Sequence, residues 1–191
     1  MHDKLSPAAS PLTVQPSVAI ATHVALVGLP GVGKSSIGWR AAELLGCKFV
    51  DLDEAITDRD GRPIPQIFAE DGESAFRDFE TETLQAVLDI EQPLLLATGG
   101  GIVVRPDNRE MLRAGAGVLW LRASIDTLLP RVARNQNRPL FAETDAKAKL
   151  QELSQQRNPL YGEVASEVCD VDDLTIEQIA SCVVELMKVR S

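Results

Sequence analysis

A glycine-rich octapeptide, GLPGVGKS, begins at Gly28 and is the segment whose residue types most directly indicate chemistry. Its spacing matches G-x-x-x-x-G-K-[ST], the phosphate-binding loop of nucleoside-triphosphate enzymes. Glycines let backbone N–H groups approach phosphate oxygens, and a helix beginning at Lys34 adds the positive end of its dipole. Lys34 can reach the β- and γ-phosphates, and the Ser35 hydroxyl can ligate Mg²⁺. We therefore predict that ATP binds with magnesium, through Gly31, Val32, Gly33, Lys34, Ser35 and Ser36.

The alternative for this loop is a chance glycine turn that carries a surface lysine. An apolar strand before the loop and an amphipathic helix after it disfavour that alternative. The chain has no N-K-x-D motif, which GTPases usually carry to recognise guanine. The strand LLLA is followed by Thr98 and three glycines, where motor-type ATPases usually have Asp or Asp-Glu. A kinase of small molecules is the large class that remains.

Two carboxylates stand near the end of the second predicted strand. Asp51 and Asp53 lie two residues apart, so on a strand both would point to one face, with Leu52 opposite. One carboxylate could support Mg²⁺, and the other could accept a hydrogen bond from an acceptor hydroxyl and take its proton. The alternative is that both are solvated acids that cap the next helix.

Arg77 lies on a predicted helix with Glu73 four residues before it and Glu80 three residues after it. One interpretation is a surface ion pair, which stabilises a helix by a few tenths of a kcal/mol. The other is a guanidinium held by Glu80 and aimed at a substrate carboxylate, which the planar fork of arginine fits. The sequence pattern leaves both interpretations open.

Three consecutive glycines, Gly99, Gly100 and Gly101, follow an apolar strand. Such a run destabilises a fold unless a ligand must approach the backbone closely. The alternative is a tight turn without a ligand. We favour the ligand, because the carboxyl ends of parallel strands are where α/β proteins bind small molecules.

A polar segment at about residues 133–146 has the composition of a closing lid. Arg131, Arg134 and Arg138 occur in or beside it, and one of them could stabilise charge on a transferring phosphoryl group. The alternative is a solvated basic loop. Arg157 stands near a helix end, where it could simply bind exposed backbone carbonyls.

Short apolar strands alternate with helices along the chain, which predicts an α/β fold with a parallel sheet covered on both faces. The expected strands are HVALVG, CKFVDLD, PLLLATGGG, GVLWLR and residues 168–171. The expected helices are 34–45, two or three between 53 and 88 broken near residues 61–63 and 71–72, then 106–114, 124–132, 146–161 and 175–188. Thr175 and Gln178 form a predicted capping box.

The length of 191 residues suits one domain, which we place at residues 22–191 after a disordered tail at 1–21. The net charge of −9 argues against nucleic-acid binding, which needs clustered lysine and arginine. No apolar run approaches the roughly 18 to 20 residues that span a bilayer. Cys47, Cys169 and Cys182 are odd in number and suggest no disulfide framework, which fits a reduced cytoplasm.

Six segments together resemble the shikimate kinase family, in its order and spacing: GLPGVGKS, FVDLDEAI, GRPIPQIFAEDGESAFRDFE, LLLATGGG, NRPLF and RNPLY. The resemblance covers residues 23–161. It implies a three-layer sandwich with a central parallel five-stranded sheet, of the kind found in phosphate-loop nucleoside-monophosphate kinases. It also implies transfer of the ATP γ-phosphate to the 3-hydroxyl of shikimate, which yields shikimate 3-phosphate for chorismate and aromatic amino-acid biosynthesis.

The resemblance also assigns acceptor-site roles within the helices at about 53–88. Asp53 would contact the ring hydroxyls and act as the base. Arg77 and Arg157 would bind the carboxylate, and Glu80 would orient Arg77. Phe68 and Phe76 would line the pocket, and the backbone at Gly99, Gly100 and Gly101 would complete it.

At the phosphate end, the resemblance gives Lys34 and Arg138 the role of neutralising charge on the phosphates, with Arg138 on the lid. Ser35 and Asp51 would hold Mg²⁺. The segment at residues 169–173 differs from related chains near the adenine, so the adenine contacts stay open. A monomer is expected, since members of the family are commonly monomeric.

Two other functions remain as alternatives. Another small-acid kinase, such as a gluconate kinase, would also phosphorylate a hydroxyl on an acid. A non-catalytic domain that senses ATP or a ligand would keep the fold without the reaction, although no DNA-reading helix pair accompanies it.

Overall fold

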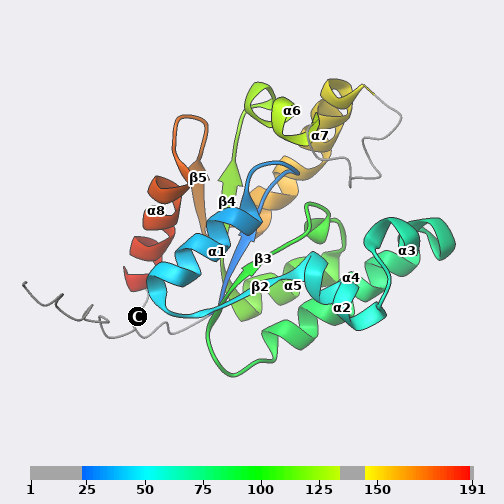
Figure 1. Cartoon of the computed structure of the whole chain (residues 1–191), viewed down its shortest axis with the longest axis horizontal. Helices are drawn as coiled ribbons and strands as arrows, with labels where there is room; N and C mark the ends of the chain where they lie inside the picture. The colour runs from blue at the N-terminus through cyan, green and yellow to red at the C-terminus, as the bar shows by residue number, and fades with distance from the viewer. Residues whose placement is uncertain (1–22, 134–144, 190–191) are drawn as a thin grey trace, which may run out of the picture.

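The computed structural model describes residues 23–133 and 145–189 of the chain, with side chains up to residue 185. Five strands form one parallel sheet in the order β2-β3-β1-β4-β5 (Figure 1). The strands are β1 (His23–Val27), β2 (Lys48–Asp51), β3 (Leu94–Ala97), β4 (Ala116–Arg122) and β5 (Glu167–Asp170). The predicted α/β sandwich with a parallel five-stranded sheet is therefore confirmed.

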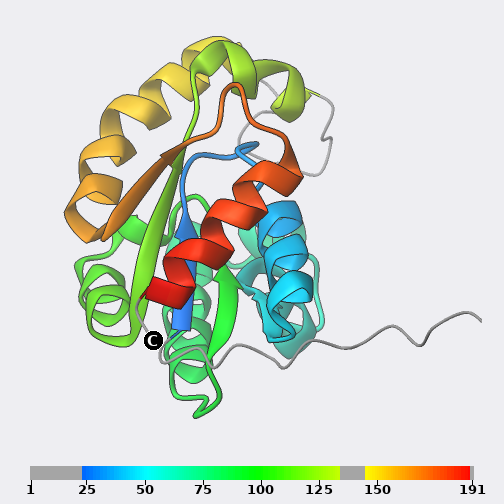
Figure 2. The ribbon, with the colours of Figure 1, turned by 90° about the vertical axis from the view of Figure 1, so that its left-hand side faces the viewer.

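Helices cover both faces of the sheet. Helices α1 (Lys34–Leu45) and α8 (Ile176–Val189) pack together on one face, while α5 (Pro106–Gly115) contacts β4 and lies beside α4 (Gly72–Leu88) and α7 (Ala146–Val164) on the other (Figure 2). This double cover explains why β1 and β3 read as continuous apolar runs, since every residue of both strands is buried.

The predicted helix at 34–45 is confirmed residue for residue as α1. Ile37, Ala41 and Leu45 repeat at helical spacing and form its buried face. The helix ends at Gly46, whose φ of 65° and ψ of 32° lie in the left-handed region that glycine adopts without strain. Local sequence alone specifies this element.

Three helices follow β2, where two or three were predicted: α2 (Leu52–Asp60), α3 (Ile64–Glu70) and α4. Arg62 lies in the break between α2 and α3. Its guanidinium hydrogen-bonds Asp60, Glu70 and Asp71 at distances between 2.5 and 3.0 Å. This network connects the ends of the helices, so the acceptor-side region predicted at 53–88 is held by charges at its turns.

The local prediction for Asp51 and Asp53 is wrong. β2 ends at Asp51, and Asp53 lies in the first turn of α2, so the two residues do not share a strand face. The Asp51 carboxylate accepts a hydrogen bond from the Asp53 N–H at 3.0 Å and caps the helix. The strand ends two residues earlier than expected and the helix begins one residue earlier, because this cap satisfies a helix donor. The capping alternative therefore holds for Asp51.

The later elements match the predictions with small shifts. α7 extends to Val164, three residues past the expected end, and includes Pro159. The reciprocal bonds between Thr175 and Gln178 confirm the capping box at the start of α8. A 3₁₀ helix, η1 (Ile102–Val104), was not predicted, and α6 (Ile125–Ala133) begins one residue late. The predicted tail and most of the lid lie outside the described residues.

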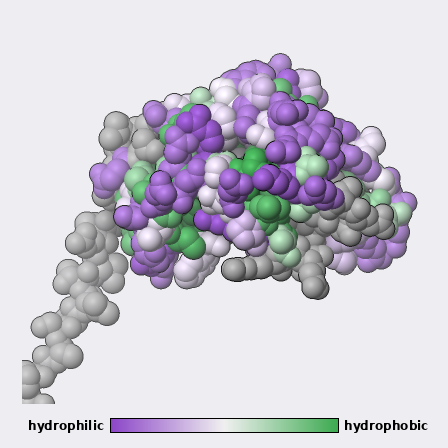
Figure 3. All heavy atoms as spheres, turned by 90° about the horizontal axis from the view of Figure 1, so that it is seen from above, coloured by the Kyte–Doolittle hydropathy of each residue, from purple (hydrophilic) through white to green (hydrophobic). Residues whose placement is uncertain are grey.

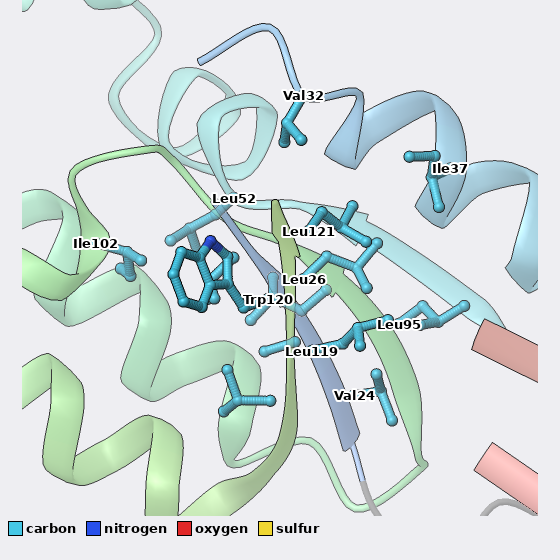
Figure 4. Close-up of a cluster of buried hydrophobic side chains, with 14 of the residues drawn as sticks. Val24, Leu26, Val32, Ile37, Leu52, Leu95, Ile102, Leu119, Trp120 and Leu121 are labelled. Atoms are coloured by element: carbon cyan, nitrogen blue, oxygen red, sulfur yellow. The ribbon is translucent and has the colours of Figure 1, made fainter. Parts of the chain in front are cut away.

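The core lies on both faces of the central strands (Figure 4). Side chains such as Leu26, Leu95 and Leu119 fill the core. The Trp120 ring of β4 packs against the Tyr161 ring of α7. The core fixes the strand ends that carry the loops described below.

Among the described residues, no helix is long and apolar enough to cross a membrane. Cys47, Cys169 and Cys182 are all free.

Gly38→Ala should destabilise the fold although alanine is the better helix former. A methyl group at Gly38 would lie 2.6 Å from the Phe49 ring and 3.2 Å from Leu26, where α1 packs on the sheet. Overpacking costs about 1 to 3 kcal/mol, against a gain of about 1 kcal/mol in helix propensity. We expect lower stability in urea unfolding. Gly162→Ala in α7 meets only Trp120 at 3.8 Å and should be neutral or stabilising. Equal gains in both variants would contradict tight packing at Gly38.

Candidate active site

Loops that follow β1, β2 and β3 meet at the carboxyl edge of the sheet, which is the upper edge in Figure 1. The face over this edge is mostly hydrophilic, with small hydrophobic areas (Figure 3). A cavity of about 530 Å³ opens there. It is lined by residues 31–37, Asp51, Asp53, Thr98, Gly100, Arg131, Leu174, Ile176 and Ile179.

The phosphate loop is held in shape by its glycines. Gly28, Gly31 and Gly33 have φ values of 144°, 86° and 102°, which L side chains rarely adopt. The Lys34 ammonium is buried and donates to the carbonyls of Gly28 at 2.7 Å and Leu29 at 3.2 Å. The loop therefore has the backbone conformation that an anion cradle needs, with the lysine inside it.

Ser35 and Asp51 bring a hydroxyl and a carboxylate together at the mouth of the loop. The Ser35 hydroxyl donates to the Asp51 carboxylate at 2.5 Å. Among the described residues no group of three His, Cys, Asp or Glu side chains could hold a metal by itself. One hydroxyl and one carboxylate fit Mg²⁺, which usually takes few protein ligands and completes its shell with phosphate oxygens and water.

The three glycines are explained by the side chains packed against them. A Cβ on Gly99 would lie 2.9 Å from both Asp53 Oδ1 and Glu80 Oε1, and one on Gly101 would lie 2.3 Å from an Arg77 nitrogen. The φ of Gly101 is −97°, so space and not backbone strain excludes a side chain there. Because Gly99 and Gly101 have no side chain, the charged groups of Asp53, Glu80 and Arg77 can lie against the backbone of the loop.

Arg77 is buried and paired with two carboxylates of its own helix. Its Nη1 donates to Glu80 at 2.7 Å and its Nη2 to Glu73 at 3.1 Å, which makes both predicted contacts. The guanidinium also lies 5.3 Å from the Phe76 ring centre, and Phe76 packs on Phe68 at 4.6 Å. A surface ion pair is thereby excluded, because the Arg77 and Glu80 side chains are only 8% and 1% exposed.

Burial and the charge of each partner both affect the pKa values of Arg77 and Glu80. Burial by itself would lower the pKa of Arg77, but Glu80 and Glu73 outweigh burial and raise it, so Arg77 stays charged. Burial raises the pKa of Glu80, and the opposing charge of Arg77 does not cancel that effect. Neither Arg77 Nε nor Glu80 Oε1 has a hydrogen-bond partner within the described part of the chain. A buried donor without a partner suits a polar ligand, and Arg77 lies against Gly101, the neighbour of a residue that lines the cavity.

Arg157 reaches the glycine loop from α7. Its Nη1 donates to the Gly100 carbonyl at 3.0 Å, and the Tyr161 hydroxyl donates to the same oxygen at 2.5 Å. Arg157 is buried, so the alternative of a side chain at an exposed helix end is wrong. Arg77 and Arg157 therefore flank neighbouring residues of one loop, which their positions in the sequence did not show.

The structure brings most predicted site residues together. The cavity gathers residues 31–36 with Asp51, Asp53 and Gly100, while Gly99 and Gly101 contact the Arg77–Glu80 pair. Arg134 and Arg138 lie outside the described residues. Thr98, Tyr161, Leu174, Ile176 and Ile179 were not predicted; Thr98 directly precedes the glycines, and that position is the one signal that could have found it.

Comparisons with known proteins agree with this geometry. Residues 30–188 match the family model described as shikimate kinase. The chain is 44% identical to a shikimate kinase of Xanthomonas oryzae pv. oryzae over 80% of this chain and 84% of that protein, and 39% identical to one of Marinomonas sp. over 88% and 93%. A solved shikimate kinase of Acinetobacter baumannii in complex with shikimate superposes with a TM-score of 0.85 at 34% identity, covering 92% of this chain and 96% of that one.

Gly101→Ala should weaken binding of the predicted acid acceptor while leaving ATP binding intact. The new methyl would displace the Arg77 guanidinium from the loop, and disturbing a buried charge pair costs about 2 kcal/mol or more. We expect at least about a tenfold higher Kd for shikimate by calorimetry. Gly115→Ala, whose methyl would meet Leu88 at 3.3 Å, is the control and should bind normally. Unchanged shikimate binding in Gly101→Ala would mean that Arg77 is not part of the acceptor site.

Proposed function

The chain belongs to the shikimate kinase family, and from that premise we propose that its site transfers the γ-phosphate of ATP to the 3-hydroxyl of shikimate. The products are shikimate 3-phosphate and ADP, in the biosynthesis of chorismate and the aromatic amino acids. The observation that supports this best is the position of the buried Arg77 and Arg157 beside the glycine loop. Two buried guanidinium groups suit the carboxylate of a small acid.

The acceptor side and the phosphate loop are in direct contact. A Cβ on Gly100 would lie 3.1 Å from Pro30, so the glycine loop packs on the phosphate loop. Asp53 lines the shared cavity, and its carboxylate also faces Gly99. An acid held by Arg77 and Arg157 would thus present its ring to Asp53 close to the γ-phosphate. Such proximity supplies much of the catalysis in phosphoryl transfer.

Asp53 has the position to aim and deprotonate the acceptor hydroxyl. In the proposed step, the 3-oxygen of shikimate bonds to the γ-phosphorus and the bond from phosphorus to the β,γ-bridging oxygen breaks. The hydroxyl proton passes to the Asp53 carboxylate, and ADP leaves with the bridging oxygen. Lys34, buried within the loop, would neutralise charge on the phosphates. Glu80 would keep Arg77 oriented toward the acceptor.

We also propose that Ser35 and Asp51 hold Mg²⁺. Their oxygens lie 2.5 Å apart at the mouth of the phosphate loop, a donor set that Mg²⁺ accepts. When bound there, the ion would neutralise phosphate charge. Arg138, outside the described residues, would add a second positive charge to the transferring group, as the family resemblance implies.

Ligand contacts beyond these also belong to the proposal. Gly31, Val32, Gly33 and Ser36 would contact ATP, because they line the cavity beside Lys34. Phe68 and Phe76 would form an apolar wall for the shikimate ring, since their rings pack with centres 4.6 Å apart and Phe76 lies next to Arg77. A monomer in the cytoplasm is the state we propose. Light scattering at the mass of one 20.7 kDa chain supports the monomer, and twice that mass contradicts it.

The test of the function is ADP release from Mg-ATP with shikimate, with gluconate and with no acceptor. Strong stimulation by shikimate alone is expected, and its loss after removal of Mg²⁺ by a chelator is the expected metal dependence. Stimulation by gluconate alone would favour the other small-acid kinase. ATP binding without stimulation by either acid would favour a sensor domain and contradict the proposed function.

Asp53→Asn should keep ATP binding and lose most of kcat. The amide retains the size of the side chain but cannot accept a proton, and general-base groups contribute about 10²- to 10⁴-fold in rate. The measurement is kcat with saturating shikimate, together with the Kd for ATP. As a control, Asp58→Asn changes an exposed carboxylate on the same helix and should leave kcat unchanged. A near-normal kcat in Asp53→Asn would remove Asp53 from the chemistry.

A further inference from the structure

The Gly100 carbonyl accepts two hydrogen bonds from one helix. The Tyr161 hydroxyl donates at 2.5 Å and Arg157 Nη1 at 3.0 Å. The two residues stand four positions apart on α7, so they share one face and point at the same oxygen. This oxygen belongs to the middle glycine of the loop that contacts Asp53, Glu80 and Arg77 through its neighbours.

Tyr161 is held rigidly enough to fix that carbonyl. It is fully buried, and its ring packs on Trp120 of β4 with centres 5.9 Å apart. Burial raises the pKa of Tyr161 far above its usual range, and the neighbouring Arg157 does not cancel that effect. The hydroxyl therefore remains a donor at any working pH. A phenylalanine would fill the same core position, so packing alone does not account for the hydroxyl.

The Tyr161 hydroxyl can influence Arg157 through the Gly100 carbonyl oxygen, to which both side chains donate. A guanidinium has five N–H donors in a fixed plane, so fixing one of its bonds sets the direction of the others. With Tyr161 in place, the Gly100 carbonyl keeps one position and Arg157 Nη1 meets it there. Without the hydroxyl, Arg157 would be the remaining side-chain donor to that carbonyl within the described part of the chain, and the guanidinium plane would no longer be fixed.

We propose that Tyr161 is a positioning residue for the acceptor carboxylate, which it serves by orienting Arg157 through the Gly100 carbonyl. The assignment rests on the proposed function, in which Arg157 binds that carboxylate. It predicts a specific pattern in Tyr161→Phe. The KM for shikimate rises roughly three- to tenfold, the range that one net hydrogen bond of about 1 kcal/mol implies. The kcat and the KM for ATP stay within about twofold of the wild type.

The experiment compares two acceptors in wild type and in Tyr161→Phe. One is shikimate and the other is its methyl ester, which has no carboxylate charge for Arg157 to bind. The ester is expected to be a poorer acceptor for the wild type, and Tyr161→Phe is expected to leave its KM unchanged. A general loosening of the site would raise the KM for both acceptors, so the ester separates positioning from structure. Equal increases for both would overturn the proposal.

Thr83→Val is the matched control. The Thr83 hydroxyl is also buried on the acceptor side of the fold, but it has no hydrogen-bond partner in the described part of the chain. Removing it should leave both KM values unchanged, and thermal melting should show both variants folded. If the wild type phosphorylates shikimate and Tyr161→Phe has a normal shikimate KM, the role of Tyr161 is wrong while the function stands. If the wild type does not use shikimate, the function and this role fall together.

Discussion

The buried ion pair between Arg77 and Glu80 is the interaction on which the acceptor half of the structure depends. Charges removed from water are costly unless each has a partner close by, and these two side chains are almost fully buried. The pair lies against Gly99 and Gly101, where any side chain would collide with it. The Phe76 ring lies 5.3 Å from the Arg77 guanidinium. Glycine at positions 99 and 101 therefore makes room for this buried pair beside the loop.

Direct packing and hydrogen bonds also link the acceptor half to the phosphate loop. Pro30 packs on Gly100, and Ser35 of the loop hydrogen-bonds Asp51, which in turn caps the helix that carries Asp53. Thr98 bonds the Leu26 carbonyl of β1 from the end of β3. Short bonds thus join three strand ends, so the groups that would hold the nucleotide, the metal and the acceptor cannot move independently. Phosphoryl transfer depends mainly on such positioning.

Much of this arrangement was predictable because it is encoded over short stretches of chain. The glycines of the phosphate loop, the apolar face of α1, the cap at Thr175 and the breaks at Arg62 and Asp71 depend on residues within a few positions of each other. The partners of Arg77 were visible for the same reason, since Glu73 and Glu80 are one helical turn away. Asp53 was misplaced on a strand because the choice between strand end and helix start rests on a single capping bond.

The sequence by itself determined the α/β fold, the phosphate loop and the candidate residues, since periodicity and glycine chemistry act locally. Only the tertiary structure decided what Arg157, Tyr161 and the glycine run do. Arg157 and Tyr161 meet Gly100 across 57 and 61 residues of chain, a distance over which no spacing rule operates. Whether a charge is buried is likewise a property of the packed helices and not of its neighbours in the chain. That burial distinguishes the Arg77–Glu80 pair from an ordinary surface ion pair.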